Sequence, residues 1–120
     1  MTRIVIFGPR DLHPPLAEID AAVTSSPFAG SITEVVCGMQ RGVDLAGKAW
    51  ADERGIPVKP FPADWDAHCR AAGPIRNIAM ANYCDAGIHI SDGRQTRGSQ
   101  NMLGQMKRRG KPVYVHEVRR

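Results

Sequence analysis

The chain has 120 residues, of which 42% are hydrophobic and 23% are charged, as in an ordinary globular protein. This composition argues against a disordered or fibrous chain, and no apolar run is long enough to span a bilayer. One hydrophobic core fits this length and two do not, so a single domain over residues 1–120 is expected. The N-terminus lacks the pattern of a signal peptide. We therefore expect a cytoplasmic protein with no membrane contact.

The formal net charge of +4 is distributed unevenly along the chain. Residues 1–90 carry 8 basic and 10 acidic side chains, whereas residues 91–120 carry 8 basic and 2 acidic ones. Arginine outnumbers lysine 12 to 4, and arginine is the side chain suited to forked hydrogen bonds with phosphate or carboxylate. The positive C-terminal quarter can serve a nucleotide, a nucleic acid or only solubility.

The three cysteines, Cys37, Cys69 and Cys84, are odd in number and none forms a CxxC pair. This pattern argues against a disulfide framework and against a zinc site, and the four histidines show no metal-ligand spacing either. We therefore expect three reduced thiols, no metal and no cofactor.

Short apolar runs alternate with helical patterns along the chain. In chain order, the expected elements are a strand over residues 3–7, a helix over 16–23, a strand over 33–37, a helix over 43–54, a strand over 58–61, a helix over 74–83, a strand over 87–91, a helix over 99–109 and a strand over 112–116. This alternation predicts an α/β protein with a three-layer Rossmann-like fold and a mainly parallel five-stranded sheet.

Three local expectations accompany these elements. Residues 61–74 form the one long connection without a clear element, and such loops are often functional. Pro74 is expected at the first position of its helix, where its missing N–H is harmless. Ser99 is expected to be the N-cap of the helix that follows it.

Glycine and arginine occur together after several of the expected strands. They are Gly8 and Arg10 after the first strand, Gly38, Arg41 and Gly42 after the second, and Gly93, Arg94, Arg97 and Gly98, with Thr96 and Ser99, after the fourth. In an open parallel sheet, ligands bind at the carboxyl ends of the strands. A turn requires only glycine, so arginine at the same places indicates an anion site.

The loop after the fourth strand makes the strongest case for an anion. Its glycines permit close backbone approach, and the N–H groups of the helix that follows favour phosphate. Arg94 and Arg97 can add forked hydrogen bonds. The alternative is a polar turn with a capping serine.

Four other side chains allow both a structural and a functional interpretation. Asp44 lies in the first turn of a helix, where it can interact with the helix dipole, bind a ribose or transfer a proton. Trp65 can stack on a purine base, although its large apolar area favours packing in the core. Arg76 and Asn77 lie in the first turns of a helix and are expected to point towards the same rim as possible ligand contacts.

Several motifs together resemble the SLOG superfamily, and most closely its YspA/YpsA-related branch (the domain family DUF2493). The matching residues are Gly8 and Arg10; Gly38, Arg41, Gly42 and Asp44; Phe61 to Trp65; Ala72, Gly73, Pro74, Arg76, Asn77 and Met80; and Gly93, Thr96, Arg97, Gly98 and Ser99. The resemblance extends over nearly the whole chain. It implies a Rossmann-like domain that binds a nucleotide or a nucleotide-derived ligand and often forms a homodimer.

One departure bears on catalysis. Phosphoribohydrolases of the superfamily carry P-G-G-x-G-T-x-x-E, and aligning its G-T on Gly98 and Ser99 places Met102 where the glutamate would be. A thioether cannot act as a general base, so hydrolysis of an N-glycosidic bond would need another carboxylate, Asp44 or Asp64.

Three functions follow from the sequence. The first is a sensor or carrier that binds a small-molecule ligand of the AMP, ADP-ribose or NAD type. The second is a hydrolase or transferase acting on the N-glycosidic bond of a nucleotide. The third is a nucleic-acid binder like the DNA-uptake protein DprA, which the basic C-terminal quarter supports only weakly.

Overall fold

The computed structural model describes residues 1–119. The elements in this range are β1 (Thr2–Phe7), α1 (Leu16–Ser25), β2 (Ile32–Cys37), α2 (Val43–Glu53), β3 (Val58–Pro60), α3 (Trp65–His68), the 3-10 helix η1 (Cys69–Ala71), α4 (Ala72–Tyr83), β4 (Ala86–Ser91), α5 (Arg97–Arg108) and β5 (Val113–Glu117). None of these helices has the length and apolar character needed to cross a membrane.

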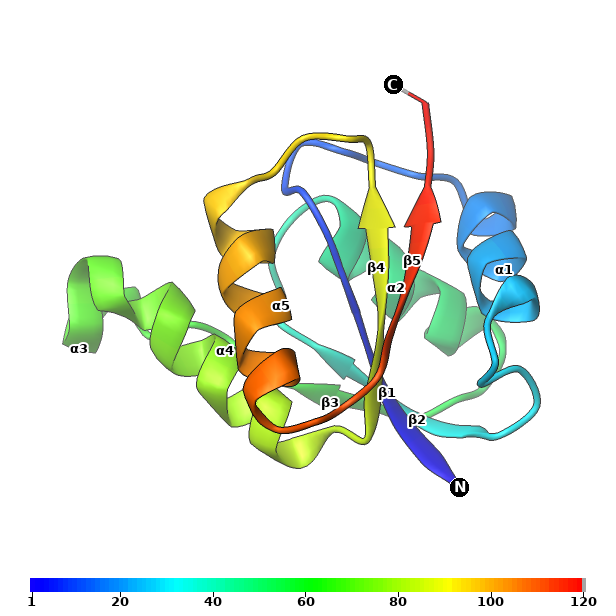
Figure 1. Ribbon diagram of the computed structural model, residues 1–120, viewed down its shortest axis with the longest axis horizontal. Coiled ribbons are helices and arrows are strands. Elements are labelled where there is room, and N and C mark those ends of the chain that lie inside the picture. Colours follow the sequence, from blue (N-terminus) through cyan, green and yellow to red (C-terminus); the bar gives the residue numbers. More distant parts are fainter. Residues whose placement is uncertain (120) are drawn as a thin grey trace.

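The five strands form one sheet in the order β3-β2-β1-β4-β5, and all neighbouring strands are parallel. Helices α1 and α2 cover one face of the sheet and α4 and α5 cover the other, so the molecule has three layers (Figure 1). The predicted Rossmann-like α/β fold is confirmed, and its sheet is wholly parallel.

Strand β1 at the centre of the sheet shows how the sequence builds both cores. Successive side chains of a strand point to opposite faces, so Ile4 and Ile6 join the core under α1 and α2. Val5 and Phe7 join the core under α4 and α5 instead. All four are at most 4% exposed. A continuous apolar run is therefore what a strand buried on both faces requires.

The strand order places a switch point beside β1. After β1 the chain builds β2 and β3 on one side of it, and then returns to build β4 and β5 on the other. The loops that follow β1 and β4 therefore leave the sheet in different directions, which opens a crevice at their carboxyl ends. Most of the functional residues predicted from the sequence lie around this crevice.

The connection over residues 61–74 differs from the expectation. It contains α3, whose N-cap Asp64 accepts a hydrogen bond from the Ala67 N–H at 3.0 Å, and η1. Helix α4 begins at Ala72, so Pro74 is its third residue and not its first. Proline is tolerated there because the first N–H groups of a helix have no partner within it.

The start of α5 also differs from the expectation. The N-cap is Thr96, which has extended backbone angles, and the helix begins at Arg97. Ser99 therefore lies inside the first turn, where its side chain is buried at 4% exposure. The expectation that Ser99 caps the helix is wrong, because Thr96 holds the N-cap position.

Candidate functional site

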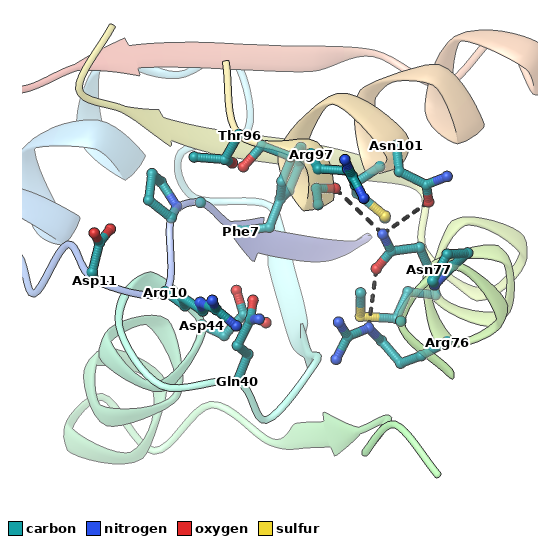
Figure 2. A pocket seen from close by; sticks show the side chains of 18 of the residues that line it. Phe7, Arg10, Asp11, Gln40, Asp44, Arg76, Asn77, Thr96, Arg97 and Asn101 are labelled. Carbon is teal, nitrogen blue, oxygen red and sulfur yellow. Dashed lines mark hydrogen bonds between the residues drawn. The ribbon is translucent and has the colours of Figure 1, made fainter. Parts of the chain in front are cut away.

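A cavity of about 890 Å³ lies at the carboxyl ends of β1 and β4, at the switch point of the sheet. Its walls come from the loop after β1, the start of α2, the α3–α4 region and the start of α5. In Figure 2, Thr96 and Arg97 lie on one side of it, and Asp44, Gln40 and Arg10 lie across from them. The volume is within the usual range of small-molecule sites.

Most of the site residues predicted from the sequence line this cavity. They are Gly8, Arg10, Asp44, Trp65, Arg76, Asn77, Thr96, Arg97, Gly98 and Ser99. They come from positions as far apart in the chain as 8 and 99, and the parallel sheet brings them together because it places the ends of its strands at one edge.

Five other predicted residues lie outside the main cavity. Arg41 and Gly93 are exposed, and Gly38 lines a smaller neighbouring cavity. Gly42 is the N-cap of α2 with a φ of +85°, and a Cβ there would lie 2.5 Å from the carbonyl oxygen of Arg10. Asp64 is exposed and caps α3. Gly42 and Asp64 thus have structural roles that explain their presence.

The first turn of α5 presents unpaired hydrogen-bond groups to the cavity. The Thr96 side chain makes no capping hydrogen bond, so the N–H groups of Arg97, Gly98 and Ser99 have no side-chain cap. The Ser99 hydroxyl is buried, and no residue within 1–119 is its hydrogen-bond partner. Because buried polar groups in folded proteins are nearly always paired, Ser99 indicates a missing ligand group or water.

Asn77 joins the two helices on this side of the cavity. Its Nδ2 donates to the Gly98 carbonyl at 3.4 Å and to Asn101 Oδ1 at 3.0 Å, and its Oδ1 accepts from Arg76 Nε at 3.0 Å (Figure 2). Asn77 is 5% exposed. The amide therefore fixes the start of α5 relative to α4 and holds the Arg76 guanidinium at the same time.

Arg76 is held by a second hydrogen bond, because its Nη1 donates to the Gly38 carbonyl at 2.6 Å. The nearby Asp44 carboxylate favours the charged guanidinium, but burial lowers the pKa of Arg76 by more than this interaction raises it. A Cβ on Gly38 would lie 2.6 Å from Asp44 Oδ2 and 2.9 Å from Arg76 Nη1. Glycine at 38 therefore leaves the space that these two side chains occupy.

Asp44 is an acidic group buried in the cavity wall, at 4% exposure. Burial raises its pKa to about 7, although Arg76 and the N–H groups of Gln40 and Gly8 partly offset this effect. The group therefore changes its protonation state near neutral pH, as the acids and bases of active sites commonly do. Interaction with the helix dipole alone, one of the roles expected for Asp44, does not account for this raised pKa.

Arg94 lines the cavity, but its guanidinium is already paired with two carboxylates. Its guanidinium forms forked hydrogen bonds to Asp92 and to Asp11, including contacts of 2.7 Å to each carboxylate. These partners raise its pKa, with Asp11 contributing most. Arg94 therefore ties the loop after β4 to the loop after β1 at one end of the cavity.

Trp65 does not pack in the core as its size predicts. Its side chain is 56% exposed, and it lines the cavity beside Gly73. Trp50, by contrast, lies in the core under α1 and α2, where it is 4% exposed and donates to Asp20 Oδ1 at 3.3 Å. Trp65 is thus available for contact with a ligand.

Sequence reasoning missed several residues of the cavity, among them Asp11, Gln40, Arg70 and Asn101. Asn101 could have been predicted from the sequence, because it lies four residues after Arg97 and so on the same face of α5. Asp11 could not have been predicted from the sequence, since its partner Arg94 is 83 positions away in the chain.

The charges of the cavity favour an anion. Arg10, Arg70 and Arg97 line it, and none of them forms an ion pair with any residue in the range 1–119. The described residues contain no cluster of three or more His, Cys, Asp or Glu side chains able to hold a metal ion. The site is therefore a polar, arginine-rich cavity with one buried acid.

Comparisons with known proteins agree with this fold. No curated protein matches the sequence at a significant level. The structure is similar to the X-ray structure of DNA processing protein A (DprA) from Streptococcus pneumoniae, with a TM-score of 0.75 and 15% sequence identity. The similarity covers 94% of this chain but only 49% of DprA, so the chain spans about half of that protein's length and shares its fold.

The model of the YspA, cpYpsA-related SLOG family matches residues 2–68, more than half of the sequence, and the chain belongs to this family.

Proposed function

We propose that the cavity binds a phosphorylated nucleotide or nucleotide-derived ligand of the AMP, ADP-ribose or NAD type, and that the protein acts as a sensor or carrier of it. The observation that carries this proposal is the uncapped first turn of α5 with the buried, unpartnered hydroxyl of Ser99. Uncapped N–H groups at a helix start favour phosphate.

Each part of the ligand has a counterpart in the cavity. The phosphate lies at the start of α5, where the Arg97 guanidinium can form a forked pair with it. The Asp44 carboxyl is suited to the ribose hydroxyls, because an ionised carboxylate only accepts hydrogen bonds and hydroxyls donate them. The exposed indole of Trp65 is suited to a base.

Replacing Arg97 with alanine should weaken binding of the phosphorylated ligand by about 10- to 100-fold, since a hydrogen bond to a charged group contributes about 1.5–3 kcal/mol. Thermal stabilisation by AMP, ADP-ribose and NAD, measured across a concentration series, reports this loss. Adenosine, which has no phosphate, should bind Arg97→Ala and wild-type protein equally.

Arg108→Ala is the matched control, because Arg108 is an exposed arginine at the opposite end of the same helix. It should leave the ligand-induced shift unchanged. Equal AMP-induced shifts in Arg97→Ala and wild type would exclude the start of α5 as the phosphate site.

A second candidate function is hydrolysis of the N-glycosidic bond of such a ligand, and Asp44 is the observation that favours it. A buried carboxyl with a pKa of about 7 is suited to general acid–base catalysis at neutral pH. The ionised Asp44 takes a proton from water as the water oxygen bonds to the anomeric carbon. The bond from that carbon to the base nitrogen breaks and its electron pair stays on the base. Adenine then takes up the proton that Asp44 holds, whereas nicotinamide leaves as a neutral ring and Asp44 returns its proton to solvent.

If the protein is a hydrolase, Asp44→Asn should lower the rate of base release by at least about 100-fold, the usual contribution of a general base. Chromatography of AMP, NAD and deoxynucleotides after incubation with the protein measures the free base. Asp64→Asn is the control and should react like wild type, because Asp64 is exposed at the N-cap of α3. No base release by wild-type protein would leave binding as the function.

A further inference from the structure

A second, smaller cavity adjoins the main one and has a volume of about 140 Å³. The two cavities share three wall residues, Gln40, Trp65 and Arg76. Met39, Pro62 and Ala63 line only the smaller cavity, which we call the side chamber. A ligand in the main cavity can therefore extend into the side chamber past these shared residues.

Part of the wall of the side chamber is apolar and exposed. Trp65 is 56% exposed and Met39 is 37% exposed, and both are large hydrophobic side chains. Pro62 and Ala63 add further apolar surface from the segment that precedes α3. Such a group of exposed apolar side chains beside a polar cavity is typical of a surface that a ligand covers.

Arg76 gives the chamber a fixed planar wall. Its guanidinium is held by the Gly38 carbonyl at 2.6 Å and by Asn77 Oδ1 at 3.0 Å, so its orientation is set before any ligand arrives. A guanidinium plane and an indole are the two protein surfaces on which flat heteroaromatic rings stack best. The chamber contains one of each.

The size of the side chamber limits what can enter it. Its volume is about 140 Å³, against about 890 Å³ for the main cavity, and it is partly open to solvent. A space of this size suits one ring system and is too small to hold a whole nucleotide. The side chamber is therefore a subsite for part of a ligand.

We propose that the side chamber holds the base of the nucleotide ligand, stacked against Trp65 and Arg76, while the phosphate lies at the start of α5 in the main cavity. The inference rests on the proposed function and extends it, because it assigns the base to a separate subsite. The Gln40 amide on the shared wall offers both a donor and an acceptor, which suits a ring with a polar edge better than a hydrocarbon.

The test compares AMP with ribose 5-phosphate, which lacks the base, in calorimetric titrations of the wild-type protein and of Ala63→Leu. Ala63 lines the side chamber but not the main cavity, so the larger leucine side chain fills only the subsite. We expect wild type to bind AMP at least about 5-fold more tightly than ribose 5-phosphate, since stacking of a base contributes about 1–3 kcal/mol. Ala63→Leu should bind AMP and ribose 5-phosphate with the same affinity, and this affinity should equal that of wild type for ribose 5-phosphate.

Tryptophan fluorescence supplies a second readout that does not depend on affinity. The protein has two tryptophans, and Trp50 is only 4% exposed, so quenching by a stacked base reports Trp65. AMP should quench the emission of wild type, whereas ribose 5-phosphate should not. Trp65→Phe should remove the quenching and keep the binding of ribose 5-phosphate.

The outcomes separate this inference from the proposed function. If both compounds bind wild type but Ala63→Leu keeps the full affinity for AMP, the base lies elsewhere and the side-chamber proposal is overturned while the phosphate site stands. If neither compound binds wild type, the proposed function fails and the subsite with it. Tight binding of AMP without quenching also contradicts stacking on Trp65.

Discussion

Asp44→Asn should make the protein more stable at alkaline pH than the wild type, although the substitution alters a buried polar residue. In the folded protein the pKa of Asp44 is raised from 3.8 to about 7, chiefly by burial. Between these two values the folded state holds a proton that the unfolded chain releases, so wild-type stability falls as pH rises through this window. The loss approaches about 4 kcal/mol above pH 7, at about 1.36 kcal/mol for each pKa unit.

Asparagine has no ionisable group and so avoids this loss. The free energy of unfolding of each protein can be measured with urea at about pH 4 and about pH 9. The value for Asp44→Asn minus the value for wild type should increase by up to about 4 kcal/mol from the lower to the higher pH. Asp64→Asn is the control, because Asn is as good an N-cap as Asp and residue 64 is exposed. If the free energy of unfolding changes with pH to the same extent in Asp44→Asn and wild type, the pKa of Asp44 is not raised in the folded protein.

Gly8→Ala should destabilise the protein by about 3 kcal/mol, at the upper end of the usual cost of overpacking. An added Cβ at Gly8 would lie 2.4 Å from the carbonyl oxygen of Ile90 and 2.9 Å from Cγ2 of Val43. The first of these is a backbone atom of the neighbouring strand β4 and cannot rotate away. The clash therefore forces apart the two central strands at the edge where the cavity lies.

Thermal unfolding should report this change as a fall of about 10 °C in Tm. Gly104→Ala is the matched control, since an added Cβ there meets nothing within 4 Å and the residue lies within α5. That substitution should instead stabilise the protein by about 0.5–1 kcal/mol, the usual gain for alanine over glycine in a helix. A Tm for Gly8→Ala near that of wild type would mean that β1 and β4 can separate at little cost.

The strands and the long helices could be predicted because each has its own local signal. Strand β1, for example, is buried at every position from Ile4 to Phe7, and its apolar run is visible in the sequence. The segment from 61 to 74 gave no such signal, since its prolines and polar residues resemble a loop. The first of its two short helical segments begins at the Asp64 cap, and neither segment contains a buried residue.

The site was predictable by position and less so by role. The rule that ligands bind at the strand ends located the cavity residues that follow β1 and β4, because glycine and arginine after a strand are visible in the sequence. Arg76 and Asn77 were inferred instead from their place at the start of a helix. Burial was not visible, so neither the raised pKa of Asp44 nor the exposure of Trp65 could be foreseen. The pairing of Arg94 with Asp11 was equally hidden, since it depends on which loops become neighbours.

The contacts that shape the cavity join distant parts of the chain, and this has a consequence for folding. Arg76 reaches Gly38 across 38 positions, Asn77 reaches Gly98 across 21, and Arg94 reaches Asp11 across 83. None of these contacts can form until β1, β2 and β4 have assembled, and closing such long loops is a late and costly step. The site is therefore absent from partly folded chains, so a bound ligand would slow global unfolding and would protect the whole sheet against amide exchange.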